Sequence, residues 1–137
     1  MTTTPQMDAP LRALLPGIDA SFDFVDETRC RAVCVIGLNH PDYDGHFDER
    51  PVLPACSQFE LLEAVARVAF NEALRFAGVP RCKFLGIISP GDTLTVDLVR
   101  AAEDATAFDF SILSEGGGPC ARGKIRFEAP RRSAHVQ

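Results

Sequence analysis

One segment of the sequence constrains the fold more than any other. Residues 56–77, CSQFELLEAVARVAFNEALRFA, contain neither glycine nor proline, and their apolar side chains recur at helical spacing. The polar stripe of this predicted helix is narrow and consists mainly of Glu60, Glu63, Arg67 and Asn71. Ser57 is predicted to be the N-cap, with Glu60 as its capping-box partner, and GVP at 78–80 is predicted to end the helix. A helix that is apolar on so many sides has to be covered by the rest of the protein.

Most of the remaining chain alternates between apolar and polar residues with a period of two, which is typical of half-buried strands. In DTLTVDLVRA, residues 92–101, Leu94, Val96 and Leu98 face one side. Further strands are predicted at residues 21–30, 31–39, 106–114 and 120–129. One long helix with about five or six antiparallel strands predicts an α+β hot-dog fold, in which the sheet wraps around the central helix. An α+β sandwich with the helix packed flat is the structural alternative.

Length and composition set the class of protein. The 137 residues suit a single domain over 1–137, with loosely ordered ends at 1–10 and 130–137. The net charge of −5 argues against a nucleic-acid binder, and no apolar run approaches the roughly 18 residues that span a bilayer. The first residues lack the pattern of a secretion signal, so we expect a cytoplasmic protein. The five cysteines and three histidines show no metal-ligand spacing, and most of the cysteines are expected to be small core residues.

The segment before the helix, GHFDERPVLPACSQFE at 45–60, resembles a known signature. It is similar to the active-site motif of bacterial β-hydroxyacyl-acyl-carrier-protein dehydratases, whose usual form is GHFPGxPxxPG followed by a helix with Glu or Asp. The matching positions are Gly45, His46, Phe47, Pro51, Pro54 and, at the position of the carboxylate, Glu60. The resemblance continues in order through LRALLPG, LNHPDYDGHF and RCKFLGIISPGDTLTVDL, and so covers nearly the whole chain. The fold of that family is the hot dog, in agreement with the periodicity.

The sequence also departs from the motif. Asp48 and Glu49 stand where the family has Pro-Gly, and Ala55 replaces the glycine after the second proline. A second register would make Glu63 the acid, but the Pro-x-x-Pro spacing favours Glu60 because it needs no insertion.

The resemblance implies the elimination of water from a 3-hydroxyacyl thioester. His46 would be the base that removes the C2 proton, and Glu60 the acid or the group that positions the departing water. Backbone N–H groups at the start of the helix would meet the charge on the thioester oxygen. The apolar neighbours of Glu60 predict a desolvated position for its carboxyl group. The residues expected to contact the substrate are Phe47, Pro54, Ala55, Cys56, Phe59 and Phe84.

The resemblance also implies partners. It implies a homodimer, because the base and the acid of the family come from different subunits, or a trimer of such dimers. The substrate would be carried by acyl carrier protein on its phosphopantetheine arm, in fatty-acid or in specialised polyene or polyketide biosynthesis, and no cofactor or metal is implied. A basic rim for carrier docking would consist of Arg81, Lys83, Arg122, Lys124 and Arg126. The alternatives are a hot-dog thioesterase and a non-catalytic hot-dog subunit that pairs with an active paralogue.

Overall fold

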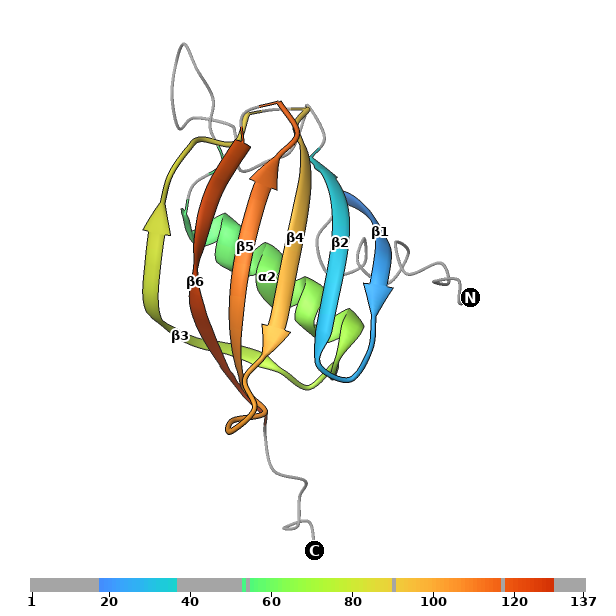
Figure 1. The fold of residues 1–137 in the computed structure, drawn as a ribbon, viewed down its shortest axis with the longest axis vertical. Coiled ribbons are helices and arrows are strands. Elements are labelled where there is room, and N and C mark those ends of the chain that lie inside the picture. The colour runs from blue at the N-terminus through green and yellow to red at the C-terminus, as the bar shows by residue number, and fades with distance from the viewer. Residues whose placement is uncertain (1–17, 37–52, 54, 90, 117, 130–137) are drawn as a thin grey trace, which may run out of the picture.

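Six antiparallel strands form one sheet, and a single described helix lies against one of its faces (Figure 1). The computed structural model describes residues 18–36, 53, 55–89, 91–116 and 118–129. The elements are β1 (Ile18–Val25), β2 (Arg29–Ile36), α2 (Ala55–Ala69), β3 (Arg75–Phe84), β4 (Thr93–Arg100), β5 (Ala107–Ser114) and β6 (Gly118–Glu128). The strand order is β1-β2-β4-β5-β6-β3, so β1 and β3 are the edges. The predicted α+β hot-dog architecture is confirmed.

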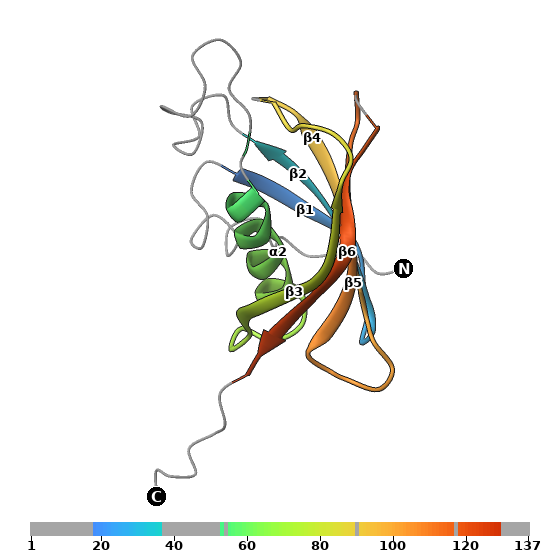
Figure 2. The ribbon, with the colours of Figure 1, turned by 90° about the vertical axis from the view of Figure 1, so that its left-hand side faces the viewer.

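The alternation in the sequence separates the two faces of the sheet. Leu94, Val96 and Leu98 are fully buried, as predicted, whereas the residues between them are only half-buried. The curved sheet holds α2 on its inner face, which Figure 2 shows from the side. The residues of α2 that become buried there are Ser57, Gln58, Leu61, Leu62, Ala64, Val65 and Ala66. The broad apolar face of α2 is therefore buried against the sheet, as the sequence predicted.

The helix ends at Ala69, and the prediction that it would continue to Ala77 is wrong. The side-chain oxygen of Asn71 accepts a hydrogen bond of 2.9 Å from the N–H of Ala73, and this local turn competes with a further helical turn. Arg67 donates to the carbonyl oxygen of Glu72 and holds the same turn. The prediction for Ser57 is also wrong, because Ser57 is the third residue of the helix and is buried rather than capping it.

Strand β3 begins inside the segment that was predicted to be helical, and GVP at 78–80 lies within it. Proline has no N–H to donate, but an edge strand tolerates it where the pairing is irregular. The ladder between β3 and β6 shifts register between Phe76 and Gly78 and again between Gly78 and Arg81. The edge position therefore explains why GVP interrupts the pairing locally instead of ending a helix.

Three of the cysteines, Cys30, Cys34 and Cys120, are buried, as expected for small core residues. Burial raises the pKa of the Cys30 and Cys34 thiols to about 12, so both are unreactive near neutral pH. Cys82 is half-buried, and Cys56 is exposed at the start of α2. In the described ranges, no helix has both the length and the apolar character needed to cross a membrane.

The close approach of β3 to β6 depends on Gly123. A Cβ atom at this position would collide with the carbonyl oxygen of Arg81 on the neighbouring strand. We therefore predict that Gly123→Ala forces the two strands apart and lowers the free energy of unfolding by about 1–3 kcal/mol, the range for overpacked sites. Urea denaturation measures this change. Gly116→Ala is the matched control, because a Cβ atom at Gly116 meets nothing within 4 Å, and equal stabilities of the two variants would contradict the prediction.

Candidate active site

The N-terminal end of α2 is open to solvent. Ala55 and Cys56, the first two residues of the helix, are exposed, and no acidic side chain lies in this first turn. The first N–H groups of a helix have no acceptor within the helix and form the positive end of its dipole. This end of α2 can therefore stabilise a negatively charged oxygen.

A pocket of about 340 Å³ lies beside this end of the helix. The residues that line it are Cys56, Phe59, Glu60, Glu63 and Phe76. Four of them come from one side of α2, and Phe76 comes from the first part of β3. The pocket thus places two carboxyl groups and a thiol beside aromatic rings.

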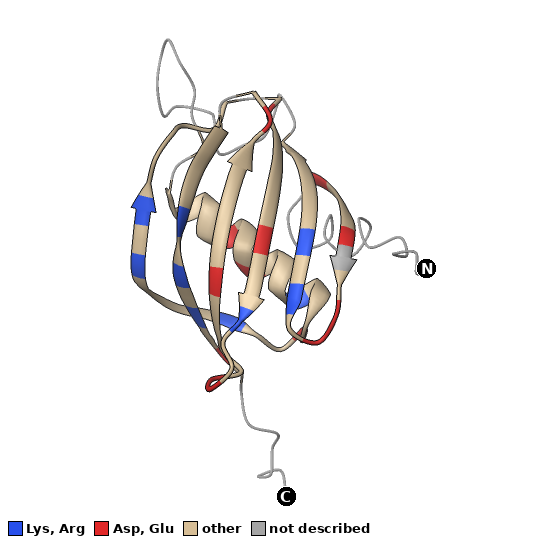
Figure 3. Ribbon diagram, viewed as in Figure 1, with Lys and Arg blue, Asp and Glu red and all other residues tan. Residues whose placement is uncertain are grey.

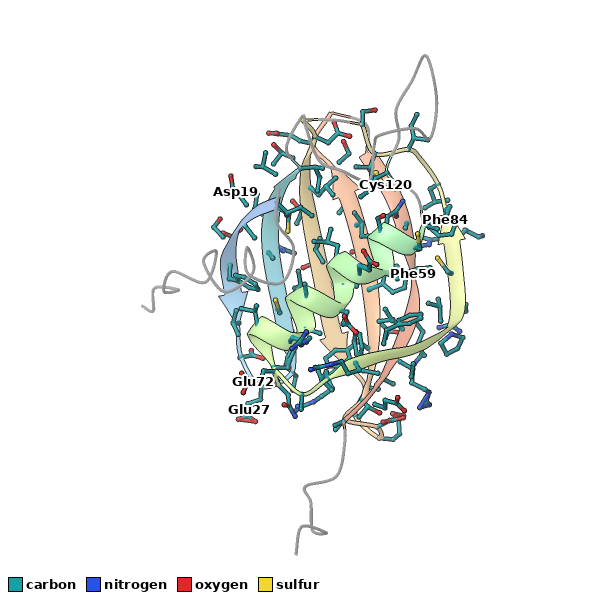
Figure 4. The ribbon with its side chains drawn as sticks, turned by 180° about the vertical axis from the view of Figure 1, so that it is seen from behind. Asp19, Glu27, Phe59, Glu72, Phe84 and Cys120 are labelled. Carbon is teal, nitrogen blue, oxygen red and sulfur yellow. The ribbon has the colours of Figure 1, made fainter. Side chains whose placement is uncertain are left out.

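Two phenylalanines form the apolar wall of this pocket, and a third packs against one of them. The rings of Phe59 and Phe76 are stacked, with centroids 5.7 Å apart and an angle of 8° between their planes. Phe84 meets Phe59 from the other end of β3, with a centroid distance of 6.1 Å. Figure 4 shows Phe59 and Phe84 side by side between α2 and β3. An apolar group that enters the pocket would contact Phe59 and Phe76.

The two carboxyl groups of the pocket have different surroundings. An oxygen of Glu63 accepts a hydrogen bond of 2.7 Å from the backbone N–H of Phe76, and so ties α2 to β3. Arg67, one turn further along the helix, does not pair with Glu63 but donates to the carbonyl oxygen of Glu72. Within the described residues, the carboxyl group of Glu60 has no hydrogen-bond or ion-pair partner. Glu63 therefore has a structural role, and the carboxyl group of Glu60 is available to a ligand.

The structure brings together some of the predicted site residues. Cys56, Phe59 and Glu60 line one pocket, and Phe84 contacts Phe59. Ala55 begins the helix but is not among the residues that line the pocket. Three further predicted site residues, His46, Phe47 and Pro54, lie outside the described residues. Their roles stay predictions.

Two features of the pocket differ from expectation. Glu60 is exposed in the single chain, so the described residues of one subunit do not supply the desolvated position that its apolar neighbours suggested. Phe76 was missed because RFAGVP was read as the end of the helix and a stop signal. Gly78 and Pro80 interrupt that segment, so the sequence gives only a weak signal for a strand there.

The contrast between the two carboxyl groups predicts different effects on stability. Glu63→Ala removes the acceptor for the N–H of Phe76 and should lower the free energy of unfolding by about 1 kcal/mol. Glu60→Ala should change it by less than about 0.5 kcal/mol, as for other exposed positions. Urea denaturation of both variants measures the difference, and a larger loss for Glu60→Ala than for Glu63→Ala would contradict these roles.

Comparison with known sequences points to dehydratases. The sequence model of the ApeI-like family, described as ApeI dehydratase, matches residues 23–124. The chain is 31% identical over 88 residues to the 3-hydroxyacyl-[acyl-carrier-protein] dehydratase FabZ of Staphylococcus carnosus. This match covers 59% of the chain and 61% of that relative. The match to the FabZ protein of Staphylococcus aureus is 32% identical and covers 60% of that relative, so the chain spans about three fifths of the curated relatives.

Solved structures share the fold at low identity. The chain resembles a chain of the dehydratase heterocomplex ApeI:P from Xenorhabdus doucetiae with a TM-score of 0.69 and 19% identity, over 78% of this chain and 93% of that one. It also resembles a hypothetical thioesterase with coenzyme A from Streptococcus pneumoniae, with a TM-score of 0.62 and 9% identity, over 86% of this chain and 89% of that one. These likenesses support the hot-dog fold.

Proposed function

The chain belongs to the ApeI-like dehydratase family, and from this premise we propose that it eliminates water from (3R)-3-hydroxyacyl groups carried on acyl carrier protein. The products would be a trans-2-enoyl thioester and water. The observation that carries the proposal is the position of Glu60, whose exposed carboxyl group lines an aromatic-walled pocket beside the start of α2. We place the reaction in fatty-acid or specialised polyene or polyketide biosynthesis, in the cytoplasm.

The first chemical task is to remove the weakly acidic C2 proton. An imidazole is neutral near pH 7 and suits this role, which we assign to His46 by its position in the motif. Negative charge then develops on the thioester oxygen. The N–H groups of Ala55 and Cys56 at the exposed start of α2 would stabilise that charge, since no carboxylate in the first turn opposes it.

The second task is to protonate the departing hydroxide. A carboxyl group performs it near neutral pH only if its surroundings keep it protonated, which requires removal from water. Glu60 is exposed in the single chain, so we propose that a second copy covers the pocket and supplies His46. Large apolar side chains exposed on β3 and just after it support self-association at this edge: Phe76, Phe84, Leu85 and Ile87.

Two other functions remain as alternatives. The similar Xenorhabdus doucetiae structure is a dehydratase heterocomplex, and Asp48 and Glu49 of this chain depart from the motif. Both observations favour, as a second candidate, a subunit that needs a different hot-dog partner. A thioesterase would use Glu60 to direct a water molecule onto the thioester carbonyl.

Assays with two thioesters separate these functions. Purified protein is incubated with a 3-hydroxyacyl thioester and with the matching saturated acyl thioester. We predict formation of the enoyl product, measured by its absorbance, without release of free thiol. Thiol release from the saturated substrate would identify a thioesterase, and no reaction with either would favour the subunit of a heterocomplex.

Substitutions at the two proposed catalytic residues test their roles. His46→Ala and Glu60→Gln should each lower kcat by about 100-fold or more, the range for the loss of a general acid or base. Glu63→Gln is the matched control, because its amide oxygen can still accept the hydrogen bond from Phe76. Retained turnover in Glu60→Gln, with loss of turnover in Glu63→Gln, would transfer the acid role to Glu63.

A further inference from the structure

A second cavity, of about 500 Å³, lies on the sheet where β3, β6 and β5 meet. Its lining includes the polar and charged residues Arg81, Lys83, Asp109, Ser111 and Arg122. We call it the basic cleft. Figure 3 shows blue Lys and Arg positions gathered on β3 and β6, in a chain whose net charge is −5.

Like charges face each other directly across the two strands of the basic cleft. Lys83 pairs with Arg122 in the antiparallel register, and Arg81 pairs with Lys124. Residues directly opposite in an antiparallel pair project from the same face, and like charges there are destabilising. The fold alone gives no reason for two such pairs in succession.

Carboxylates compensate only part of this charge. Asp109 lies 3.7 Å from the Lys124 ammonium group, and Asp104 lies 2.7 Å from the guanidinium group of Arg126. Across the described ranges, no carboxylate forms an ion pair with Arg81, Lys83 or Arg122. Three cations therefore line one cleft without a partner from the described chain.

We propose that the basic cleft binds the phosphate groups of the molecule that carries the acyl thioester. A ligand with two or more negative charges matches three uncompensated cations. The planar guanidinium groups of Arg81 and Arg122 suit the bidentate binding of phosphate oxygens, and the Ser111 hydroxyl group adds a donor. The cavity volume lies within the range of small-molecule sites.

The identity of this ligand rests on the proposed function, whereas the binding of phosphate groups does not. Two sources share the chemistry: the phosphopantetheine arm of a carrier protein, and coenzyme A with its additional adenosine phosphates. Pantetheine 4′-phosphate represents the first source, and adenosine 3′,5′-bisphosphate represents the part that only coenzyme A has. Binding of the bisphosphate would identify coenzyme A, whereas binding of pantetheine 4′-phosphate alone would show that the cleft recognises only the part that the carrier protein also has.

Isothermal titration calorimetry of the full chain with these two compounds tests the proposal. We expect at least one to bind, pantetheine without phosphate not to bind, and Lys83→Glu and Arg122→Glu each to weaken binding by about tenfold or more, since an attraction becomes a repulsion. Arg100→Glu on β4 is the matched control, because it makes the same charge change outside the cleft and should leave binding unchanged. Failure of both compounds to bind, or equal weakening by Arg100→Glu, would overturn the proposal.

Thermal unfolding separates a binding role from a structural one. In phosphate-free buffer of low ionic strength, Lys83→Glu turns a like-charge pair with Arg122 into an opposite-charge pair, so its Tm should rise while its binding is lost. Loss of both stability and binding would show that Lys83 serves the fold, and would overturn the assignment.

Turnover of an N-acetylcysteamine thioester, which has no phosphate group, tests the proposed dehydration separately. We expect the wild-type chain to turn it over. If it does not, the proposed function fails while the calorimetric result for the basic cleft stands. If it does but neither phosphate compound binds, the basic-cleft proposal fails alone.

Discussion

The burial of α2 against the inner face of the sheet is the constraint on which the rest of the structure depends. The helix is apolar on most sides, and alternating residues of the central strands supply the surface that covers it. Phe70, just after the helix, contacts Phe108 of β5, which in turn contacts Phe127 of β6, so aromatic packing fixes the far end of α2 as well. At the other end, the stacked rings of Phe59 and Phe76 and the hydrogen bond from Phe76 to Glu63 place the first part of α2 beside β3.

Edge strand β3 links the two sites that we describe. Phe76 lines the Glu60 pocket and Phe84 contacts Phe59 of that pocket, whereas Arg81 and Lys83 line the basic cleft. The hydrogen bond from Phe76 to Glu63 ties this strand to α2, and the absence of a side chain at Gly123 allows it to approach β6 closely. One strand thereby shapes the proposed site for the acyl group and the proposed site for the phosphate groups of its carrier.

The sequence predicted the fold wherever one periodicity dominates. The strict alternation at Leu94, Val96 and Leu98 gave the correct inner face of β4, and the apolar run around Leu61 and Leu62 gave the central helix. The prediction placed the end of the helix too late because the turn at Asn71 depends on a single side-chain hydrogen bond. GVP is typical of a helix end, but here it lies within an edge strand, which tolerates it. In the site, local spacing identified Glu60, but the partner of Glu63 lies thirteen residues away on another element and could not be found from spacing.

The central claim is that His46 of one copy and Glu60 of another form one active site. Mixed dimers of the two inactive variants, His46→Ala and Glu60→Gln, test it most directly. If the two residues come from different copies, each mixed dimer contains one intact site, and a random mixture should regain about a quarter of wild-type turnover by two-fold symmetry. If both residues come from the same copy, every site in the mixture lacks one of them. The account predicts the recovery of activity, and a mixture as inactive as its components would contradict it.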